Sequence, residues 1–277
     1  MSFITIDDEK CNRCGICIAE CPERVIEMAS KESLPTVTEF GKDLCIECGH
    51  CVAVCPEEAF NLDIMTAEQC SPAQPELLIT LEQMEQHIRF RRSIRTYKKK
   101  PVPRDILERL IDAARYAPTA KNLQPVHWLV IEDREEVNRR GSMVIDWMRS
   151  MLKGESEALF TEFMMSQIVG DWERGGDWIC RGAPHMIVAH GPTDLPIPAS
   201  ESGCMIALTT LELAAPSFGL GACWGGYFNA AANNYPPLRQ ALDLPENHDP
   251  YGAMMIGYPA YEYHRIPLRK EPSITWR

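Results

Sequence analysis

Eight of the twelve cysteines fall into two copies of one spacing, and this spacing constrains the first quarter of the chain more than any other feature. The cysteines of the first copy are Cys11, Cys14, Cys17 and Cys21, followed by Pro22, and those of the second are Cys45, Cys48, Cys51 and Cys55, followed by Pro56. Corresponding cysteines lie 34 positions apart, so the segment is an internal repeat. Because a repeat this short has little apolar core, whatever its thiolates bind must supply much of its folding free energy.

The spacing C-x2-C-x2-C-x3-C-P is typical of thiolates that hold [4Fe–4S] clusters, with three ligands from one run and the fourth from the other. The predicted ligand sets are Cys11, Cys14, Cys17 with Cys55, and Cys45, Cys48, Cys51 with Cys21. Two structural zinc sites are the alternative, since C-x2-C pairs also bind zinc. Zinc, however, does not require three cysteines at steps of three and a Cys-Pro, twice over. The segment 1–66 resembles the bacterial two-cluster ferredoxins.

The charge balance limits the partners of this chain. The formal net charge is −11, which argues against nucleic acid or an anionic membrane as a general partner. Residues 1–66 carry 13 acidic and 5 basic side chains. Such an acidic surface could attract a basic electron donor or acceptor.

The remaining cysteines point to a reducing compartment. Cys70, Cys180, Cys204 and Cys223 are scattered, without the pattern of a disulfide framework. Charged residues at positions 7–10 interrupt any apolar targeting segment, and no uncharged apolar stretch is long enough to span a bilayer. We therefore expect a cytoplasmic protein with no membrane segment.

The 277 residues are enough for two domains. We predict a ferredoxin-like domain at 1–66, a polar, proline-bearing linker at 67–79 and a larger domain at 80–277. Apolar periodicity in the larger domain predicts helices at 78–91, 104–116 and 202–218, the last ended by Gly219, and strands at 128–131, 185–190 and 253–256. Because helices and strands mix without a regular βαβ rhythm, the predicted class is α+β.

Residues 134–180 are rich in methionine and tryptophan and are broken by several glycines. We expect two helices and a loop there. The segment is either an ordinary packed insertion or an adaptable apolar cap over a pocket, because methionine fits varied shapes.

A basic stretch at 89–100 places seven cations among twelve residues of an acidic protein. Its Arg91, Arg92, Ser93 and Arg95 offer guanidinium forks and a hydroxyl, which suit a dianionic phosphate. The alternative is a solvated cationic helix end, and this interpretation fits Lys98–Lys100. No G-x-G-x-x-G follows a strand, so the dinucleotide-binding fingerprint is absent.

Two further segments have the composition of ligand-binding loops. In the loop at 117–125, Asn122 and Gln124 carry amides that donate and accept hydrogen bonds at once, a pattern that suits the edge of a flavin ring. In the segment at 219–226, glycines such as Gly225 and Gly226 allow backbone N–H groups to approach a flat ring. By contrast, His185 and His190 flank a predicted strand, and we expect them to be structural.

The order of these segments resembles the nitroreductase family of FMN enzymes. The motifs that carry the likeness are RRSIR at 91–95, APTAKNLQP at 117–125, GLGACWGG at 219–226, IGYPA at 256–260 and HRIPLRK at 264–270. The whole chain is thus similar to a nitroreductase fused to a two-cluster ferredoxin.

The resemblance implies an α+β homodimer with FMN at the subunit interface and with the C-terminal residues 271–277 reaching onto the partner. The implied FMN contacts are Arg91, Arg92, Ser93 and Arg95 at the phosphate and ribityl chain, Asn122 and Gln124 at the ring edge, backbone near Gly225 and Gly226 at the ring, and Arg269 at the phosphate, with Arg265 or Lys270 as further cations. The chain departs from the family after the NLQP proline, where Val126 and His127 stand in place of an aromatic residue.

The function implied is reduction of a nitro, quinone or similar electrophilic acceptor by hydride transfer from flavin N5, which requires no catalytic side chain. Lys121 is a candidate to stabilise the reduced ring. Two one-electron clusters match the two electrons of a hydride, so we expect electrons from ferredoxin or another low-potential donor, with NAD(P)H dispensable. The alternatives are a non-catalytic flavin and iron–sulfur electron-transfer module, a flavin enzyme specialised for one metabolite, and a phosphate site for a non-flavin ligand.

Overall fold

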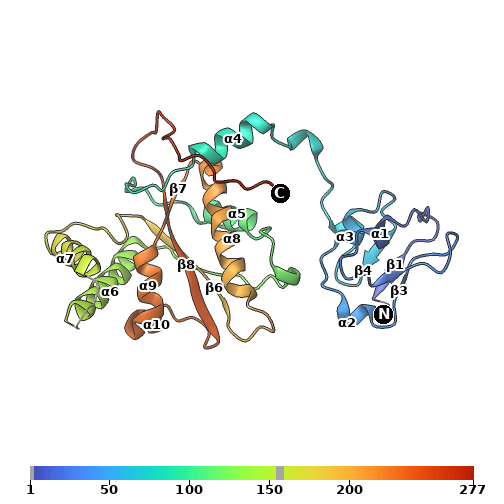
Figure 1. The fold of residues 1–277 in the computed structure, drawn as a ribbon, viewed down its shortest axis with the longest axis horizontal. Coiled ribbons are helices and arrows are strands. Elements are labelled where there is room, and N and C mark those ends of the chain that lie inside the picture. Colours follow the sequence, from blue (N-terminus) through green and yellow to red (C-terminus); the bar gives the residue numbers. More distant parts are fainter. Residues whose placement is uncertain (1–2, 154–158) are drawn as a thin grey trace. The chain divides into compact units, whose positions relative to one another are not determined.

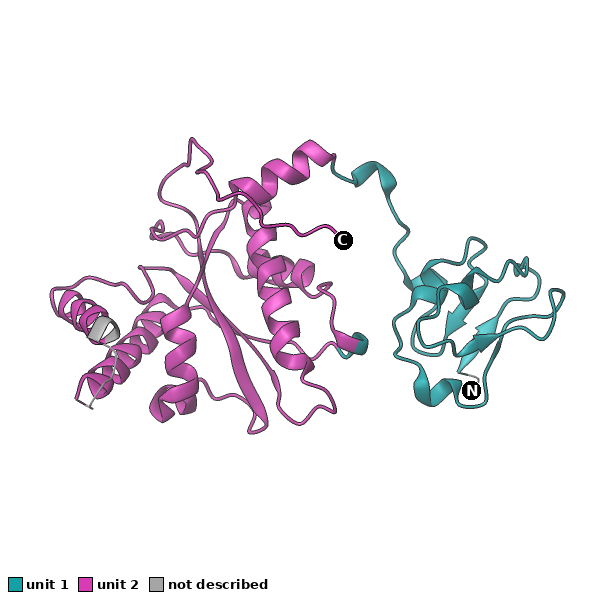
Figure 2. Cartoon of the chain, in the orientation of Figure 1, with its two compact units in different colours: residues 1–79, 121–123 teal, residues 80–120, 124–277 magenta. Residues whose placement is uncertain are grey.

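The computed structural model describes residues 3–153 and 159–277. The chain divides into two units (Figures 1 and 2): the first runs to Ile79 and includes Lys121–Leu123, and the second comprises Thr80–Ala120 and Gln124–Arg277. Each unit has its own hydrophobic core.

The first unit consists of two small antiparallel pairs of strands and three short helices. Strand β1 (Ile4–Ile6) pairs with β4 (Phe60–Leu62), and β2 (Ile26–Glu27) pairs with β3 (Thr36–Val37). The helices are α1 (Ile16–Ala19), α2 (Gly41–Leu44) and α3 (His50–Ala53). Apolar residues of both halves, such as Val25, Val52 and Phe60, form one small core.

The backbone of the first unit repeats with the period of the cysteines. Positive φ angles occur at three pairs of positions 34 residues apart, namely Arg13 and Glu47, Gly15 and Gly49, and Arg24 and Glu58. Left-handed backbone is uncommon for residues other than glycine, so its recurrence at matched positions indicates that the two halves fold alike.

Short 3₁₀ turns η1 (Ala67–Gln69) and η2 (Pro75–Leu77) follow the first core. Thr66 and Gln69 cap η1 reciprocally through their side chains and backbone N–H groups. The segment predicted as a linker therefore carries local structure, although its side chains are largely exposed.

A four-stranded sheet in the order β5-β6-β8-β7 forms the centre of the second unit (Figure 1). Its strands are β5 (His127–Ile131), β6 (His185–Pro192), β7 (Gly221–Trp224) and β8 (His248–Gly257). All three pairings are antiparallel, so the expected α+β class is confirmed.

Alternation along the strands divides the core between the two faces of this sheet. On β6, Met186 and Val188 belong to one apolar cluster, whereas Ile187 and Ala189 belong to the other. This is the period-2 pattern of a strand buried on both faces. The sheet is therefore the middle of three layers.

Helices cover both faces (Figure 1). The helices of the second unit are α4 (Leu81–Phe90), α5 (Arg104–Ala114), α6 (Arg134–Leu152), α7 (Leu159–Glu173), α8 (Ala199–Ala214), η4 (Ala215–Phe218), α9 (Gly226–Asn234) and α10 (Pro236–Ala241). The 3₁₀ turn η3 (Ala120–Asn122) begins in the second unit and continues into residues assigned to the first. Buried side chains of α5 and α8 pack on one face, and those of α6, α7, α9 and α10 pack on the other. Thr80 caps α4 through a capping box with Gln83.

Most of the predicted elements are present, with one correction. Gly219 has a φ of 69° and ends the helical segment, as predicted. The residues that follow were expected to form a loop, but 221–224 form strand β7. The reason is that Ala222 and Cys223 alternate between the two apolar clusters and their backbone pairs with β8, so burial outweighs the glycines.

The segment 134–180 contains the two expected helices. Several of its apolar side chains, including Trp147, Met148 and Met165, are buried in the core, which supports the interpretation as a packed insertion. Trp178 is an exception, with 44% of its surface exposed. Residues 154–158 of this segment lie outside the described residues.

None of the described helices combines the length and the apolar character that a membrane span requires.

Candidate functional site

The eight motif cysteines gather into two separate cavities in the first unit. Cys11, Cys14, Cys17 and Cys55 line one cavity, and Cys21, Cys45, Cys48 and Cys51 line the other. The structure thus brings together the same four-cysteine sets that the spacing predicts. Each set has three members from one run and one from the other.

Burial and neighbouring cysteines disfavour free thiolates in these cavities. Burial, and then the neighbouring thiolate charges of Cys48 and Cys45, raise the pKa of Cys51 to about 12. Burial also raises the pKa of Cys17, with further contributions from Cys14 and Cys55. A cation placed among these sulfurs would remove this repulsion, because metal ligands bind as thiolates.

Backbone N–H groups point at two of the sulfurs. The Glu47 N–H donates to Cys45 Sγ at 3.4 Å, and the Ala59 N–H donates to Cys55 Sγ at 3.3 Å. Such hydrogen bonds stabilise negative charge on a sulfur and tune the potential of a bound cluster. The cavities therefore have the donor set and the polarity that iron–sulfur clusters require.

In the second unit, residues 91–95 lie beside β7 and run in the same direction. A parallel bridge joins Ser93 to Ala222, and the Ile94 N–H donates to the Ala222 carbonyl at 2.8 Å. Because the two segments are parallel, the Arg91 end lies near the start of β7 and the Arg95 end lies near its C-terminus. Two cavities follow each other along this pair of segments.

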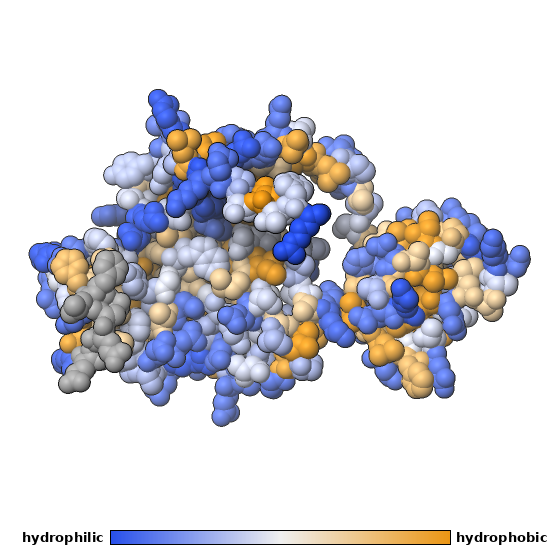
Figure 3. Space-filling model, in the orientation of Figure 1, coloured by the Kyte–Doolittle hydropathy of each residue, from blue (hydrophilic) through white to orange (hydrophobic). Residues whose placement is uncertain are grey.

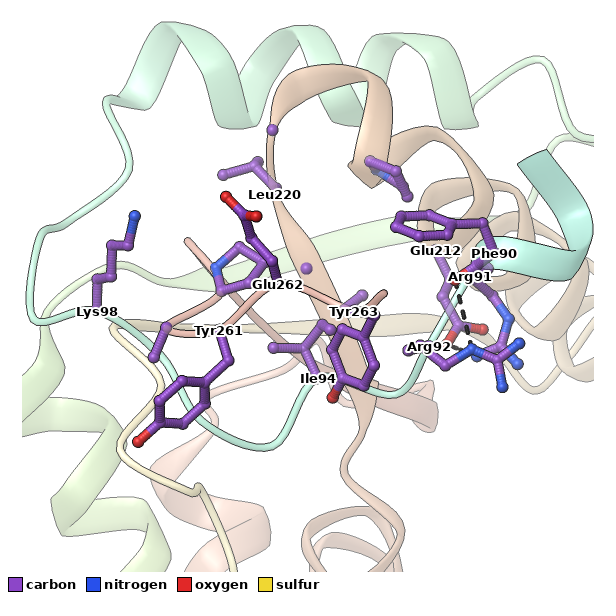
Figure 4. A pocket seen from close by; sticks show the side chains of 16 residues that line it. Phe90, Arg91, Arg92, Ile94, Lys98, Glu212, Leu220, Tyr261, Glu262 and Tyr263 are labelled. Carbon is purple, nitrogen blue, oxygen red and sulfur yellow. Dashed lines mark hydrogen bonds and ion pairs between the residues drawn. The ribbon is translucent and has the colours of Figure 1, made fainter. Parts of the chain in front are cut away.

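The first cavity, of about 450 Å³, contains the Arg91 end of the 91–95 segment (Figure 4). It is lined by Arg91, Arg92 and Lys98 together with aromatic residues such as Tyr261 and Tyr263. Burial and the charges of Arg269 and Arg91 hold the pKa of Arg92 below its ordinary value. Two of the predicted phosphate ligands, Arg91 and Arg92, therefore line this cavity, and the charge of a third, Arg269, acts on Arg92. An anion would relieve this repulsion.

Glu212 of α8 is a buried carboxylate beneath this cavity. One oxygen accepts from the Arg91 guanidinium at 2.8 Å, as the dashed line in Figure 4 marks, and the other accepts from Trp224 Nε1 at 3.2 Å. Arg91 is therefore already paired with a carboxylate, whereas Arg92 donates to the backbone carbonyls of Phe90 and Arg89 and has no ion-pair partner among the described residues. Glu212 also links the cationic cavity to the end of β7.

The second cavity, of about 410 Å³, lies at the other end of β7. Its lining includes three predicted residues, Arg95, Gly225 and Gly226. Trp178, Ile179, Arg181, Cys223, Trp224, Tyr227 and Met255 complete the lining. The cavity therefore combines guanidinium groups, aromatic rings and glycine backbone.

The two glycines differ in what they can offer a ligand. The Gly225 N–H is already used, because it donates to the Ala253 carbonyl at 2.8 Å. Gly226 is the first residue of α9, where backbone N–H groups have no partner within the helix. A Cβ added to Gly226 would meet no atom within 4 Å, so open space rather than packing surrounds this position. Gly226 can therefore donate to a flat ligand that lies against it.

Asn122 and Gln124 lie at the η3 turn and are not among the described residues that line the cavity around Arg95. Lys121, Asn122 and Gln124 all have left-handed backbone, with φ of 49°, 51° and 47°. Three such residues so close together are unusual, and strained backbone tends to occur at functional sites.

Histidines form a further polar group in the second unit. His185 Nδ1 donates to the Glu132 carbonyl at 2.7 Å, and its Nε2 accepts from the Val102 N–H at 2.8 Å, so both nitrogens have structural partners. His190 and His248 lie with their Nδ1 atoms 2.9 Å apart. Burial, and then the charge of His248, lower the pKa of His190 to about 4.

Glu212, Arg181 and Tyr227 belong to these cavities without having been predicted from the sequence. A carboxylate near the end of a largely apolar helix was the available signal for Glu212, since such a group is buried only with a partner. No signal in the sequence marked Arg181, because the turns that place it depend on tertiary structure.

Comparison with known proteins matches both parts of the chain. The pattern of the nitroreductase family covers residues 88–258, and that of a 4Fe-4S dicluster domain covers residues 10–60. An NADH dehydrogenase of Thermus thermophilus is 46% identical over 198 residues, which are 68% of this chain and 92% of that protein. An FMN reductase (NAD(P)H) of Bacillus subtilis is 29% identical over 187 residues, 66% of this chain and 69% of that protein.

A solved structure shares the fold. The nitroreductase of Desulfitobacterium hafniense, crystallised with bound FMN, superposes with a TM-score of 0.57 at 22% identity, covering 72% of this chain and 99% of that one. With the family pattern covering more than half of the residues, the chain belongs to the nitroreductase family of FMN-dependent oxidoreductases, and it carries a 4Fe-4S dicluster domain ahead of the nitroreductase domain.

Proposed function

We propose that this protein binds FMN and uses electrons from two [4Fe–4S] clusters to reduce an electrophilic acceptor such as a nitro compound or a quinone. The observation that carries the proposal is the parallel run of 91–95 beside β7, which joins a cationic cavity to a glycine-lined cavity. A ligand with a phosphate at one end and a flat ring at the other matches this order.

The residues of the cationic cavity fit a phosphate. Arg92 and Arg269 are the proposed clamp, because their mutual repulsion is relieved by a dianion. Arg91 supports the clamp from its ion pair with Glu212, and Ser93 offers a hydroxyl beside β7. Arg265 and Lys270 are further candidates on the same exposed C-terminal segment.

The residues of the second cavity fit a flavin ring. Arg95 and the N-terminus of α9 place positive charge where the reduced ring carries negative charge. Gly226 permits close approach and offers a free N–H. When bound, FMN supplies hydride transfer from N5, and the surrounding residues orient the ring and the acceptor.

The proposed ligands of the two clusters are Cys11, Cys14, Cys17 and Cys55 for one, and Cys45, Cys48, Cys51 and Cys21 for the other. The two four-cysteine cavities support this assignment. Two one-electron clusters together carry the two electrons that one hydride transfer consumes. The electron donor is then ferredoxin or another low-potential donor, in a reducing cytoplasm that spares the clusters.

We also propose a homodimer in which each FMN site uses both subunits. Asn122 and Gln124 are then the proposed contacts at the ring edge of the partner's site. Exposed apolar side chains on and before α4, among them Leu78, Leu81 and Met84, supply a surface that a partner would cover (Figure 3). Sedimentation of the wild type and of Leu81→Glu tests this, since the charge should yield monomers with weakened FMN binding.

The electron route is tested by reducing the FMN anaerobically with a low-potential donor in wild type and Cys14→Ser. Cys70→Ser is the matched control, because Cys70 belongs to the first unit but lies outside the repeat. The expected result is slow flavin reduction in Cys14→Ser only. Equal rates in all three proteins would refute the route, and a flavin that turns over no acceptor would favour a non-catalytic module.

A further inference from the structure

We infer that Arg181 binds an anionic group of the acceptor, so that the preferred substrates are flat electrophiles carrying a carboxylate or a similar anion. This inference rests on the proposed function, because it takes the cavity at the end of β7 as the flavin site. It names a substrate class for that site and a residue that selects it.

Arg181 belongs to the same cavity as the proposed flavin contacts. It lines the cavity with Arg95 and Gly226, and the described lining contains no aspartate or glutamate. Burial raises the pKa of Cys223 at the cavity wall, and the charges of Arg95 and Arg181 both oppose that rise. The cavity therefore contains two positive charges and no lining carboxylate to balance them.

The loop that carries Arg181 is held in place by one carboxylate. Asp177 accepts backbone N–H groups from Ile179 at 3.0 Å, Cys180 at 2.7 Å and Gly182 at 2.8 Å. The Gly182 carbonyl accepts from the Arg134 guanidinium at 2.7 Å. These bonds fix the backbone on both sides of Arg181. Ligand binding therefore costs little further conformational entropy in this loop.

The backbone of Arg181 is itself strained. Its φ of 54° lies in the left-handed region, which a residue with a Cβ adopts at a cost of about 1 kcal/mol. The surrounding hydrogen bonds maintain this conformation. Such strain in a residue that faces a cavity is a feature of ligand-binding positions.

The guanidinium of Arg181 is available for a ligand. In the described part of the chain it has no ion-pair partner, and it lies over the Trp178 ring, with the guanidinium carbon 5.9 Å from the ring centroid. Trp178 and Tyr227 are the half-exposed aromatic side chains of the same cavity. An aromatic acceptor with an anionic substituent would contact these rings and the Arg181 guanidinium at the same time.

Arg181 is distinct from the proposed phosphate clamp. Arg92 lines the cavity at the other end of β7, and the charge of Arg269, from the C-terminal segment, acts on Arg92. Arg181 comes from a separate loop after α7. One positive charge near the ring is enough to stabilise the negative charge of the reduced flavin, so the second can bind the acceptor.

The test compares two nitroaromatic compounds of the same shape, 4-nitrobenzoate and 4-nitrobenzamide, which differ in charge. Each is titrated into the oxidised FMN-loaded protein, and the dissociation constant is read from the perturbed flavin absorption. In Arg181→Gln, we expect the constant for 4-nitrobenzoate to rise about tenfold to a hundredfold and that for 4-nitrobenzamide to stay within about twofold.

Two variants complete the design. Arg181→Lys keeps the charge and should recover part of the 4-nitrobenzoate affinity. Arg174→Gln is the matched control, because Arg174 belongs to the same segment and pairs with Asp171 rather than lining the cavity. It should bind both compounds like wild type.

Equal effects of Arg181→Gln on both compounds, or no effect on either, would overturn the inference. Loss of FMN from Arg181→Gln would also overturn it, because Arg181 would then belong to the cofactor clamp. A wild type without a flavin spectrum would instead mean that the proposed function had failed.

Discussion

Replacing Glu212 by glutamine tests the buried link between the two cavities of the second unit. Only 6% of Glu212 is exposed, and its oxygens accept from Arg91 and Trp224. Removing one partner of a fully buried ion pair costs about 3–5 kcal/mol. Because 25% of the Arg91 side chain is exposed, water recovers part of that loss. We therefore expect Glu212→Gln to lower the free energy of unfolding by about 1–3 kcal/mol.

The assay is thermal and urea unfolding of the full chain, with and without saturating FMN. A loss of this size corresponds to a Tm lower by about 3–10 °C for a unit of nearly two hundred residues. Glu201→Gln is the control, since Glu201 is exposed in the first turn of the same helix and should stay within about 0.5 kcal/mol of wild type.

A double-mutant cycle with Trp224→Phe isolates the hydrogen bond from the indole. Phenylalanine removes the Nε1 donor while keeping an apolar ring, and we expect a coupling free energy of about 0.5–1.5 kcal/mol. FMN affinity should fall together with stability, because Glu212 positions Arg91 at one cavity and Trp224 at the other. Unchanged stability in Glu212→Gln would refute the reasoning, and so would additive effects of the two changes.

Three further outcomes follow from the structure. Cys48→Ser should reduce the iron of anaerobically purified protein from about eight to about four atoms per chain, by metal analysis, while retaining flavin absorption. Gly221→Ala should lower the free energy of unfolding by about 1–3 kcal/mol in urea, because the added Cβ would collide with Ile94. The free energy of unfolding should decrease as the pH is lowered from about 6.5, the unfolded histidine pKa, to about 4, the folded pKa of His190. In this window the unfolded state binds a proton that buried His190 does not. His190→Asn should flatten that decline in unfolding curves measured across this window; an equal slope would exclude His190 as its source.

The cysteine repeat was readable from sequence because its chemistry is local. The spacing within each run is a property of consecutive residues, and the 34-residue period recurs in the left-handed backbone of Gly15 and Gly49. The longest elements of the second unit were likewise predictable, since α5 and β6 have apolar patterns of the right period.

Strand β7 was not predictable in the same way. Its glycines favour a loop, and only pairing with β8 and burial of Ala222 and Cys223 make it a strand. Local preference is a weak contribution that tertiary packing overrides.

The sequence by itself determined the cluster-binding segment, the α+β class and the cationic stretch at 91–95, because each depends on residue types at short, fixed separations. The tertiary structure alone decided that Arg91 pairs with Glu212 and that Arg95, Arg181 and Gly226 line one cavity. These contacts join residues more than thirty positions apart, and a chain specifies such neighbours only through the packing of its strands and helices around a common core.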